Sequence, residues 1–237
     1  MTGGTEGGPF ATTLWTEVLR AVDPETPRRR EALDKLIGAY WKPLYSYSRR
    51  RGHSAQTSQD HVQGFFTRLL EKDWLSAADP ERGRFRTYLR TAFSRYLSNE
   101  ADHAAALKRG GDHAILSLDF EDAERGLSLD PADPRTPDQH FDREWAVTVL
   151  RRANDRLRVE CEEQDREIRY QLLQAALGGD EGGHQGLADR FGIRLHDVKN
   201  HLFQARTRLR VLMLEEISSL VDGEADSELQ ELWKALG

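Results

Sequence analysis

The stretch LADRFGIRLHDVKNHLFQARTRL, residues 187–209, decides the fold class of this chain. Leu187 and Phe191 have helical spacing, and Gly192 after them can take the positive φ that a sharp reversal needs. Ile193 would fill the angle between this helix and the next. The second helix has one apolar stripe with a residue at every third or fourth position: Val198, Leu202, Ala205, Leu209 and Leu212. The stretch therefore predicts two short helices joined by a tight turn.

The opposite face of the second helix is polar and cationic. A narrow apolar back with such a front suits the major groove of DNA, where amide, imidazole and ammonium groups can reach base edges or phosphates. The front residues are His196, Lys199, Asn200, Phe203, Gln204 and Arg206. The spacing leaves open a plainer alternative, a surface helix pair of an ordinary all-α domain.

The second helix begins without a standard cap. Arg194 stands where a serine or threonine would cap it, so we expect the cap from elsewhere, with Asp197 in the first turn as the candidate.

Composition favours small helical domains. The length allows one large domain or two small ones, and the chain has many charged residues and a modest apolar fraction. Its net charge is mildly acidic, so a nucleic-acid binder of this composition must concentrate its basic residues locally. Arginines do cluster at 28–30, 49–51, 82–95 and 206–210, and acids cluster at 112–142 and 215–231.

Several protein classes are disfavoured by what the sequence lacks. Cys161 is the single cysteine, so no disulfide framework exists and we expect a cytoplasmic protein. Residues 1–10 have no signal-peptide pattern, and no apolar run approaches membrane-spanning length. The sequence contains no phosphate-binding glycine loop, HExxH or CxxC motif. We therefore predict no enzyme activity, no cofactor, no metal site and no membrane partner.

Apolar spacing predicts further helices along the chain. Pro43 lies inside one of them and should kink or divide it, and Ser54–Ser58 is predicted as a turn. Gly64 costs its helix roughly 1 kcal/mol relative to alanine, and it either allows a close neighbour or is simply tolerated on the outer side. A final amphipathic piece, with Leu229 and Leu232, could dock on its own domain or bind a partner. The other predicted helices are 12–22, 28–51, 59–72, 84–99 (at most to 108), one opening at 138 or 142, and 165–177.

The helix RFRTYLRTAFSRYLSN, residues 84–99, interleaves arginines with Tyr88 and other aromatic residues. Guanidinium groups can follow a nucleic-acid backbone while flat rings stack on exposed bases, which is how single strands are held. The alternative is a solvated arginine face on an ordinary helix. The arginines of this segment are Arg82, Arg84, Arg86, Arg90 and Arg95.

Residues 112–140 change character. Three prolines, many aspartates and no long periodicity predict an extended acidic linker without a packed helix. Such a linker could occupy a cationic channel in a partner, where nucleic acid would otherwise lie. The alternative is a disordered, solubilising spacer.

Together these blocks resemble a known family. The segments AYWKPLYSYSRRRGH (39–53) and SQDHVQGFFTRLLEKDWLSAADPERGRFRTYLRTAFSRYLSNE (58–100) resemble region two of a bacterial RNA polymerase sigma factor. LADRFGIRLHDVKNHLFQARTRLR (187–210) resembles region four. The linker SLDFEDAERGLSLDPADPRTP (117–137) and FDREWAVTVL (141–150) resemble the same group. This is the extracytoplasmic-function (ECF)-like group common in planctomycetes, and the resemblance covers nearly the whole chain after Phe10.

The resemblance implies an all-α fold with two small helical domains and an extended acidic linker. The implied segments are a flexible tail (1–11), a region-two domain (12–110), the linker (111–140), a region-four helix-turn-helix domain (141–216) and a tail with a short amphipathic helix (217–237). The implied partners are core RNA polymerase, through its β′ clamp and β flap, and promoter DNA. An anti-sigma or other regulatory protein is a further implied partner.

The resemblance also implies three sets of contact residues. The residues that dock on the polymerase are Asp60, His61, Gln63, Gly64, Thr67 and Arg68. Those that hold the minus-ten element are Asp79, Arg82, Arg84, Arg86, Tyr88, Arg95 and Asn99. Those that read the minus-thirty-five element are Arg194, His196, Lys199, Asn200, Phe203, Gln204 and Arg206.

This chain departs from the family pattern at three positions. Members usually carry a leucine and an acid where it has His61 and Gly64, and a capping residue where it has Arg194. These departures point to a specialised member or one that needs an additional partner. Two other functions stay open: a stand-alone helix-turn-helix regulator, and a sigma-like interaction protein that sequesters a partner.

Overall fold

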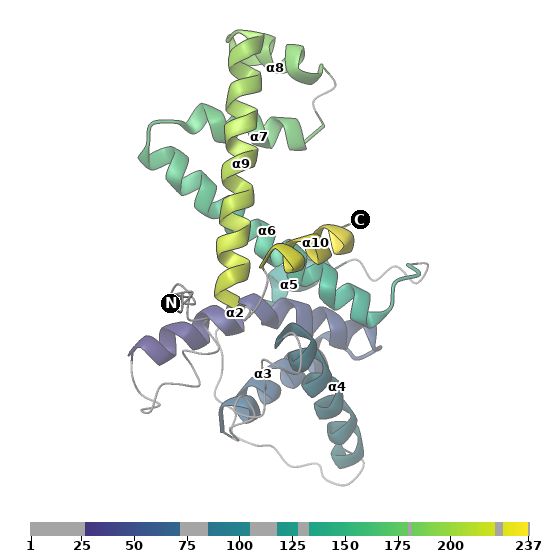
Figure 1. The fold of residues 1–237 in the computed structure, drawn as a ribbon. Coiled ribbons are helices and arrows are strands. Elements are labelled where there is room, and N and C mark those ends of the chain that lie inside the picture. Colours follow the sequence, from purple (N-terminus) through teal and green to yellow (C-terminus); the bar gives the residue numbers. More distant parts are fainter. Residues whose placement is uncertain are drawn as a thin grey trace, which may run out of the picture. The chain divides into compact units, whose positions relative to one another are not determined.

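The computed structural model describes residues 27–71, 85–104, 118–127, 133–179, 182–220 and 225–236. Within these ranges every regular element is an α-helix, which confirms the predicted all-α class (Figure 1). The helices are α2 (Pro27–Arg50), α3 (Ala55–Glu71), α4 (Phe85–Ala104), α5 (Phe120–Gly126), α6 (Pro137–Glu163), α7 (Glu167–Leu177), α8 (Gly183–Phe191), α9 (Leu195–Leu220) and α10 (Ala225–Leu236). The predicted tail 1–11 and helix 12–22 lie outside the described residues.

The chain divides into two compact units. Unit 1 comprises residues 1–148 together with 218–237, and unit 2 comprises residues 149–217. Helices α6 and α9 therefore contribute to both units. The sequence assigned residues from 141 onward to the second domain, whereas the first part of α6 lies in unit 1. The physical reason is that Phe141 and Trp145 are fully buried there, under the guanidinium groups of Arg90 and Arg86 from α4.

Helix α2 is the most buried helix of unit 1. Its tyrosines Tyr40 and Tyr45 are almost fully buried. The helix continues through Pro43 as one element, so the predicted division there does not occur. It ends at Arg50, where Gly52 takes a φ of 89° and donates its N–H to the carbonyl of Arg49. Arg49 and Arg50 lie in the last turn, where the helix dipole favours positive charge.

Helix α3 begins earlier than predicted. Residues 54–58 were expected to be a turn, but they form the start of the helix because Ser54 caps it. The Ser54 hydroxyl accepts the N–H of Thr57 at 3.1 Å, and the Ser54 carbonyl accepts the N–H of Ser58 at 2.9 Å. The cap satisfies helix donors that would otherwise lack partners, so it moves the start forward to Ala55.

Gly64 is buried between α3 and α4, and the expectation that it lies on the outer side is wrong. A Cβ at this position would lie 2.5 Å from the hydroxyl oxygen of Tyr96. Phe65 packs in the same layer, with its ring 5.0 Å from that of Phe93 and 5.7 Å from that of Tyr96. Of the two explanations for Gly64, the structure therefore supports a close neighbour.

Helix α5 corrects the expectation of an extended linker, because it lies within that segment and packs on α2. Asp119 caps it by accepting the N–H of Asp122 at 2.9 Å. The ring of Phe120 is buried, 5.2 Å from Trp41 and 5.4 Å from Tyr45. The acidic side chains of α5 then meet cations of α2, and these contacts make a short acidic segment helical.

Two ion pairs fix the charged side of α5. Asp122 lies 2.5 Å from Lys42, and Glu124 lies 2.7 Å from Arg49. Hydrogen bonding from Arg49 lowers the pKa of Glu124. Burial and the hydrogen bond to Glu124 raise the pKa of Tyr45 to about 12. These two carboxylates of the linker segment are thus neutralised by cations of α2.

Helix α6 begins with a reciprocal cap that the sequence analysis missed. Thr136 accepts the N–H of Gln139 at 3.2 Å, and the Gln139 side chain accepts the N–H of Thr136 at 2.8 Å. Pro137 occupies the first helical position, where a missing N–H has no cost. The signal T-P-D-Q was present in the sequence at 136–139.

Unit 2 consists of the end of α6, helices α7 and α8, and most of α9. Its core includes Cys161, which packs as a small apolar residue. Arg208 of α9 pairs with Glu160 of α6 at 2.7 Å, and Arg156 of α6 pairs with Glu216 of α9 at 3.0 Å. These ion pairs link the second half of α6 to α9.

Candidate nucleic-acid interface

Helices α8 and α9 form the predicted helix pair with a three-residue turn. Gly192 ends α8 in the left-handed region, at φ 65° and ψ 30°, and its N–H bonds to the carbonyl of Ala188. The N–H of Ile193 bonds to the same carbonyl at 3.1 Å. Helix α9 begins three residues after Gly192. Two helices joined by a short turn that contains glycine make a helix-turn-helix motif.

The start of α9 carries Arg194 and Asp197. The carbonyl of Arg194 accepts the N–H groups of Asp197 and Val198, and its guanidinium lies 2.8 Å from the Asp197 carboxylate. This hydrogen bond lowers the pKa of Asp197. An ionised carboxylate in the first turn is favourable at the positive end of the helix dipole. Arg194 thus lies exposed at the turn, and its guanidinium is ion-paired with Asp197.

The polar front of α9 lies on one exposed side of the helix. Val198, Leu202 and Ala205 are buried on the opposite side. Phe203 is 71% exposed, which is unusual for a large apolar side chain. The predicted residues that the structure brings together on the exposed side are His196, Lys199, Asn200, Phe203, Gln204 and Arg206.

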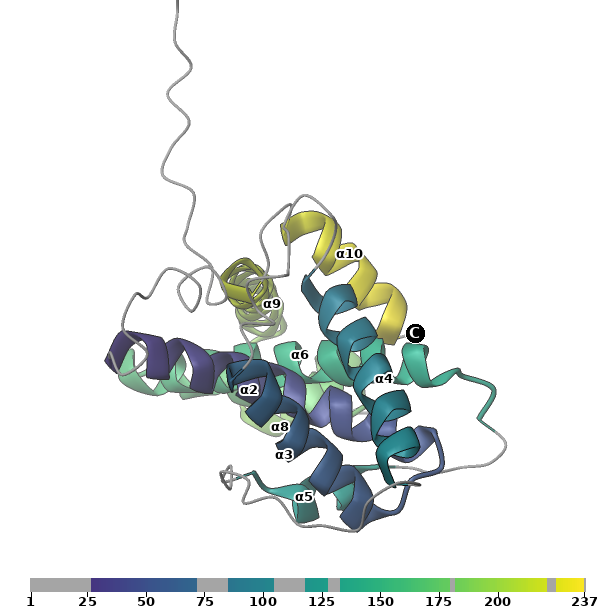
Figure 2. The same ribbon diagram turned by 90° about the horizontal axis from the view of Figure 1, so that it is seen from below.

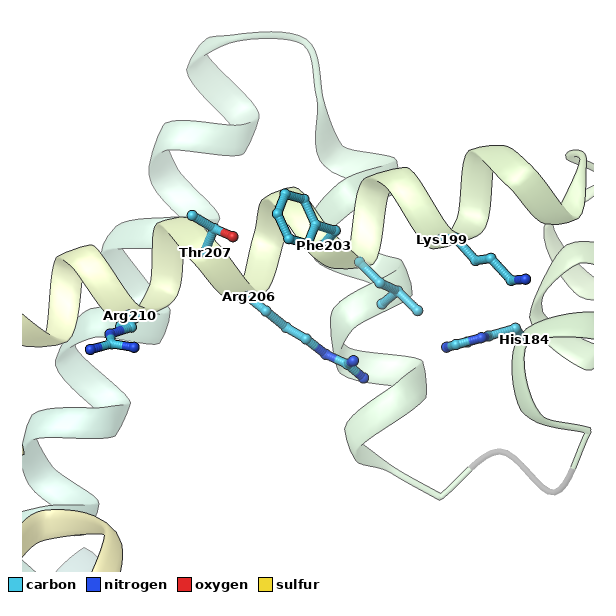
Figure 3. Close-up of a pocket in the computed structure, with 7 residues that line it drawn as sticks. His184, Lys199, Phe203, Arg206, Thr207 and Arg210 are labelled. Atoms are coloured by element: carbon cyan, nitrogen blue, oxygen red, sulfur yellow. The ribbon is translucent and has the colours of Figure 1, made fainter. Parts of the chain in front are cut away.

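A shallow groove of about 330 Å³ follows this side of α9 (Figure 3). Lys199 and Arg206 of α9 extend toward it, together with His184 from the first turn of α8. The remaining lining residues are Leu202, Phe203, Thr207 and Arg210. His184 was not among the residues predicted from the sequence. It lies in a glycine-rich segment, and the start of α8 there has no periodic apolar residues that would indicate a helix. The groove offers cationic and aromatic groups to a polyanion that carries flat bases.

Neighbouring side chains engage part of the front. The amide of Asn200 donates to the Nε2 atom of His196 at 2.9 Å, and Arg169 of α7 donates to the side-chain oxygen of Gln204. Within the described part of the chain, Lys199 and Arg206 make no ion pair. These two cations are therefore the groups of α9 best placed to meet an external phosphate.

The predicted minus-ten residues of α4 differ in their exposure to solvent. Arg95 and Asn99 are exposed, and Tyr88 is partly exposed on the same side of the helix. Burial raises the pKa of Tyr88. The predicted residues Asp79, Arg82 and Arg84 lie outside the described residues.

Arg86 was predicted to face DNA, but its side chain is buried within the protein. Its side chain is 6% exposed, and its guanidinium stacks 4.5 Å from the centre of the Trp145 ring. It also pairs with Asp142 at 3.4 Å and with Glu228 at 3.2 Å. The partner carboxylates come from α6 and α10, so the local pattern of α4 carried no sign of them.

The predicted polymerase-docking residues of α3 also differ in their exposure. Asp60 is exposed, and Gln63 and Thr67 are partly exposed on the same side. Arg68 pairs with Glu100 at 2.6 Å and lies over the ring of Tyr96. These residues leave an outward polar strip on α3.

His61 turns away from this strip and toward α2. It lies 3.2 Å from the hydroxyl of Ser48, and its ring is 4.7 Å from that of His53. Burial lowers the pKa of both histidines. With Gly64 also buried, two of the six predicted docking positions serve internal packing.

No family model, curated protein or solved structure matches this chain. No helix in the described ranges is long and apolar enough to cross a membrane. The same ranges contain no cluster of three or more histidine, cysteine or acidic side chains that could hold a metal ion. Their geometry shows an all-α protein in which a short turn joins α8 to α9 and leaves one cationic side of α9 exposed.

Proposed function

We propose that this chain is an ECF-type sigma factor, a non-enzymatic subunit that gives bacterial RNA polymerase its promoter specificity. The observation that carries the proposal is the exposed front of α9 in a helix-turn-helix motif, with Lys199 and Arg206 beside the open groove. The order of segments that resembles sigma regions two and four supports it further. Its partners would be core polymerase, promoter DNA and a regulatory protein, and its place of action the cytoplasm.

In this proposal α9 reads the minus-thirty-five element as duplex. The amides of Asn200 and Gln204 suit the edge of adenine, and the exposed ring of Phe203 suits a thymine methyl group. Lys199 and Arg206 contact phosphates, which position the helix without reading sequence. Arg194 and His196 lie at the end of α9 that would enter the groove first.

The other contacts in this proposal, those with the minus-ten strand and the polymerase, are made by unit 1. Tyr88, Arg95 and Asn99 share one side of α4 and would contact the opened minus-ten strand by stacking and charge. Asp60, Gln63 and Thr67 share the outward side of α3 and would dock on the β′ clamp. The expected region-two and region-four domains, 12–110 and 141–216, belong to this proposal, with the corrections that residues 141–148 pack in unit 1 and that the segment between the domains contains the packed helix α5.

One observation favours a second candidate, a stand-alone helix-turn-helix regulator. The front of α9 is open, whereas Arg86 and Arg90 of α4 are engaged by carboxylates of their own chain. A regulator would need only the open helix.

Reconstitution with core RNA polymerase tests the proposal. We expect a stable complex and promoter-dependent transcription from DNA recovered with the protein from its native cells. Asp60→Lys reverses an exposed charge on the docking side, and it should abolish transcription while leaving duplex DNA binding intact. Asp155→Lys reverses an exposed charge on α6 and should change neither. If Asp60→Lys has no effect, or if core polymerase forms no complex, the stand-alone regulator is the better description.

A further inference from the structure

Helix α10 places an acidic side chain in the interior of unit 1. Glu228 is 3% exposed, and Leu229 and Leu232 are buried with it. A buried glutamate needs a partner, because removing its charge from water is costly. Its carboxylate lies 3.2 Å from the guanidinium of Arg86, where α10 lies beside the start of α4 (Figure 2).

Acidic side chains cover the inner cations of α4. Arg90 lies one turn beyond Arg86, and it pairs with Asp138 at 3.0 Å and with Asp142 at 3.2 Å. Asp142 also reaches Arg86. Two arginines of α4 are thus covered by two carboxylates of α6 and one of α10. The two aspartates are part of a long helix, whereas Glu228 is on a short helix near the chain end.

Several contacts hold α10 in this position. Besides the two leucines and Glu228, Arg143 of α6 donates to the carbonyl of Leu236 at 2.9 Å. Trp233 is half exposed. A buried ion pair adds little net stability, because the loss of hydration offsets most of its attraction. Glu228 therefore determines where α10 docks more than how strongly it docks.

We propose that α10 competes with single-stranded DNA for Arg86. The inference rests on the proposed function, in which α4 contacts the opened promoter strand. A carboxylate and a phosphate offer a guanidinium the same pair of acceptor oxygens, so one can replace the other. While α10 is docked, Glu228 occupies Arg86. DNA that binds the α10-released form more tightly shifts the population toward that form.

The substitution Glu228→Gln in the full chain tests this competition. The probe is a fluorescent single-stranded oligonucleotide of mixed sequence, with anisotropy measured across a salt series. We expect about tenfold tighter binding, since Arg86 gains one charge-assisted contact. The log–log salt slope should steepen by about 0.7 for that one added phosphate. Glu231→Gln removes the same charge from the same helix, where Glu231 pairs with Lys234, and it should change neither value.

A second substitution shows whether the increase in affinity for single-stranded DNA depends on Arg86. Adding Arg86→Gln to Glu228→Gln should return the affinity and the salt slope to those of the parent chain. If the double variant binds as tightly as the single one, the competition is wrong. Circular dichroism must show that each variant retains its helix content.

Hydrogen exchange of the unmodified chain gives an independent measurement. Adding the oligonucleotide should increase deuterium uptake in residues 225–236 and leave uptake in residues 137–148 unchanged. Unchanged or reduced uptake in 225–236 would overturn the inference.

The two proposals fail in different ways. If core polymerase supports promoter-dependent transcription but Glu228→Gln binds single strands like the parent, only the competition is excluded. If no complex with core polymerase forms and no variant binds single strands, the proposed function fails and the competition fails with it.

Discussion

Helices α4 and α9 each carry three arginines among polar and aromatic residues, yet the cations of the two helices have opposite surroundings. On α9, Lys199 and Arg206 border an open groove. On α4, the guanidinium of Arg86 is enclosed by Trp145, Asp142 and Glu228. In this structure a cationic helix face is therefore open to nucleic acid only where the rest of the chain leaves it uncovered.

The difference comes from what each unit packs against the helix. Unit 2 supplies apolar residues to the back of α9 and little acid to its front. Unit 1 supplies carboxylates from α6 and α10 to the inner side of α4, whereas the predicted contact residues Tyr88, Arg95 and Asn99 lie on its outer side. Two experiments test this contrast directly, and two further ones test the packing of unit 1.

The largest effect should come from removing a buried charge on α4. Arg86→Met leaves Glu228 buried without its partner, so we expect the free energy of unfolding to fall by about 3–5 kcal/mol. Arg206→Met, the matched change on α9, should alter it by less than about 0.5 kcal/mol. Urea denaturation followed by circular dichroism measures both.

A double substitution provides the control for this prediction. Arg86→Met combined with Glu228→Met removes both charges, and it should recover most of the lost stability. Equal, small effects of Arg86→Met and Arg206→Met would contradict the contrast between the two helices.

The next effect concerns DNA affinity. Replacing Lys199 and Arg206 together with alanine should weaken duplex binding by about a hundredfold at low salt, because two charge-assisted contacts are lost. The log–log salt slope should fall by about two units. Alanine at Arg151 and Arg158 removes the same charge from α6 and should have little effect. Equal losses from both pairs would mean that the open groove is not the binding surface.

A smaller effect is expected where α4 packs on α3. Gly64→Ala brings a methyl group against the Tyr96 hydroxyl, and we expect a net loss of about 1–2 kcal/mol after the gain in helix propensity. In a Tyr96→Phe background the same substitution should be neutral or stabilising, because the obstructing oxygen is gone. A double-mutant cycle measures the coupling, and its absence would show that Gly64 has no close neighbour.

The smallest effect is a pH dependence in unit 1. Burial lowers the pKa of His53 and His61, so the unfolded chain binds these protons more readily than the folded one. Stability should therefore fall as the pH drops below the ordinary histidine value of about 6.5. His61→Gln should reduce that fall by less than about 1 kcal/mol, as measured by melting temperature across this range. A steeper loss of stability with falling pH in the variant would contradict this prediction.

Prediction of the candidate site from the sequence was best where the relevant forces are local. The six residues predicted for the α9 front are all exposed, because the apolar stripe fixes which residues face outward. His184 was missed, since only the turn at Gly192 brings α8 beside that front. Arg86 was predicted wrongly, because the carboxylates that engage it lie on other helices.

Most of the described helices, and the reversal between α8 and α9, follow from the sequence alone. Periodicity of apolar residues and the left-handed conformation open to Gly192 act within a few residues, so they can be read along the chain. Only the tertiary structure decided that α5 is a packed helix, that Gly64 faces Tyr96, and that Arg86 is enclosed. Each of these depends on contacts between side chains far apart in the sequence, where charge and burial are set by the neighbours that folding supplies.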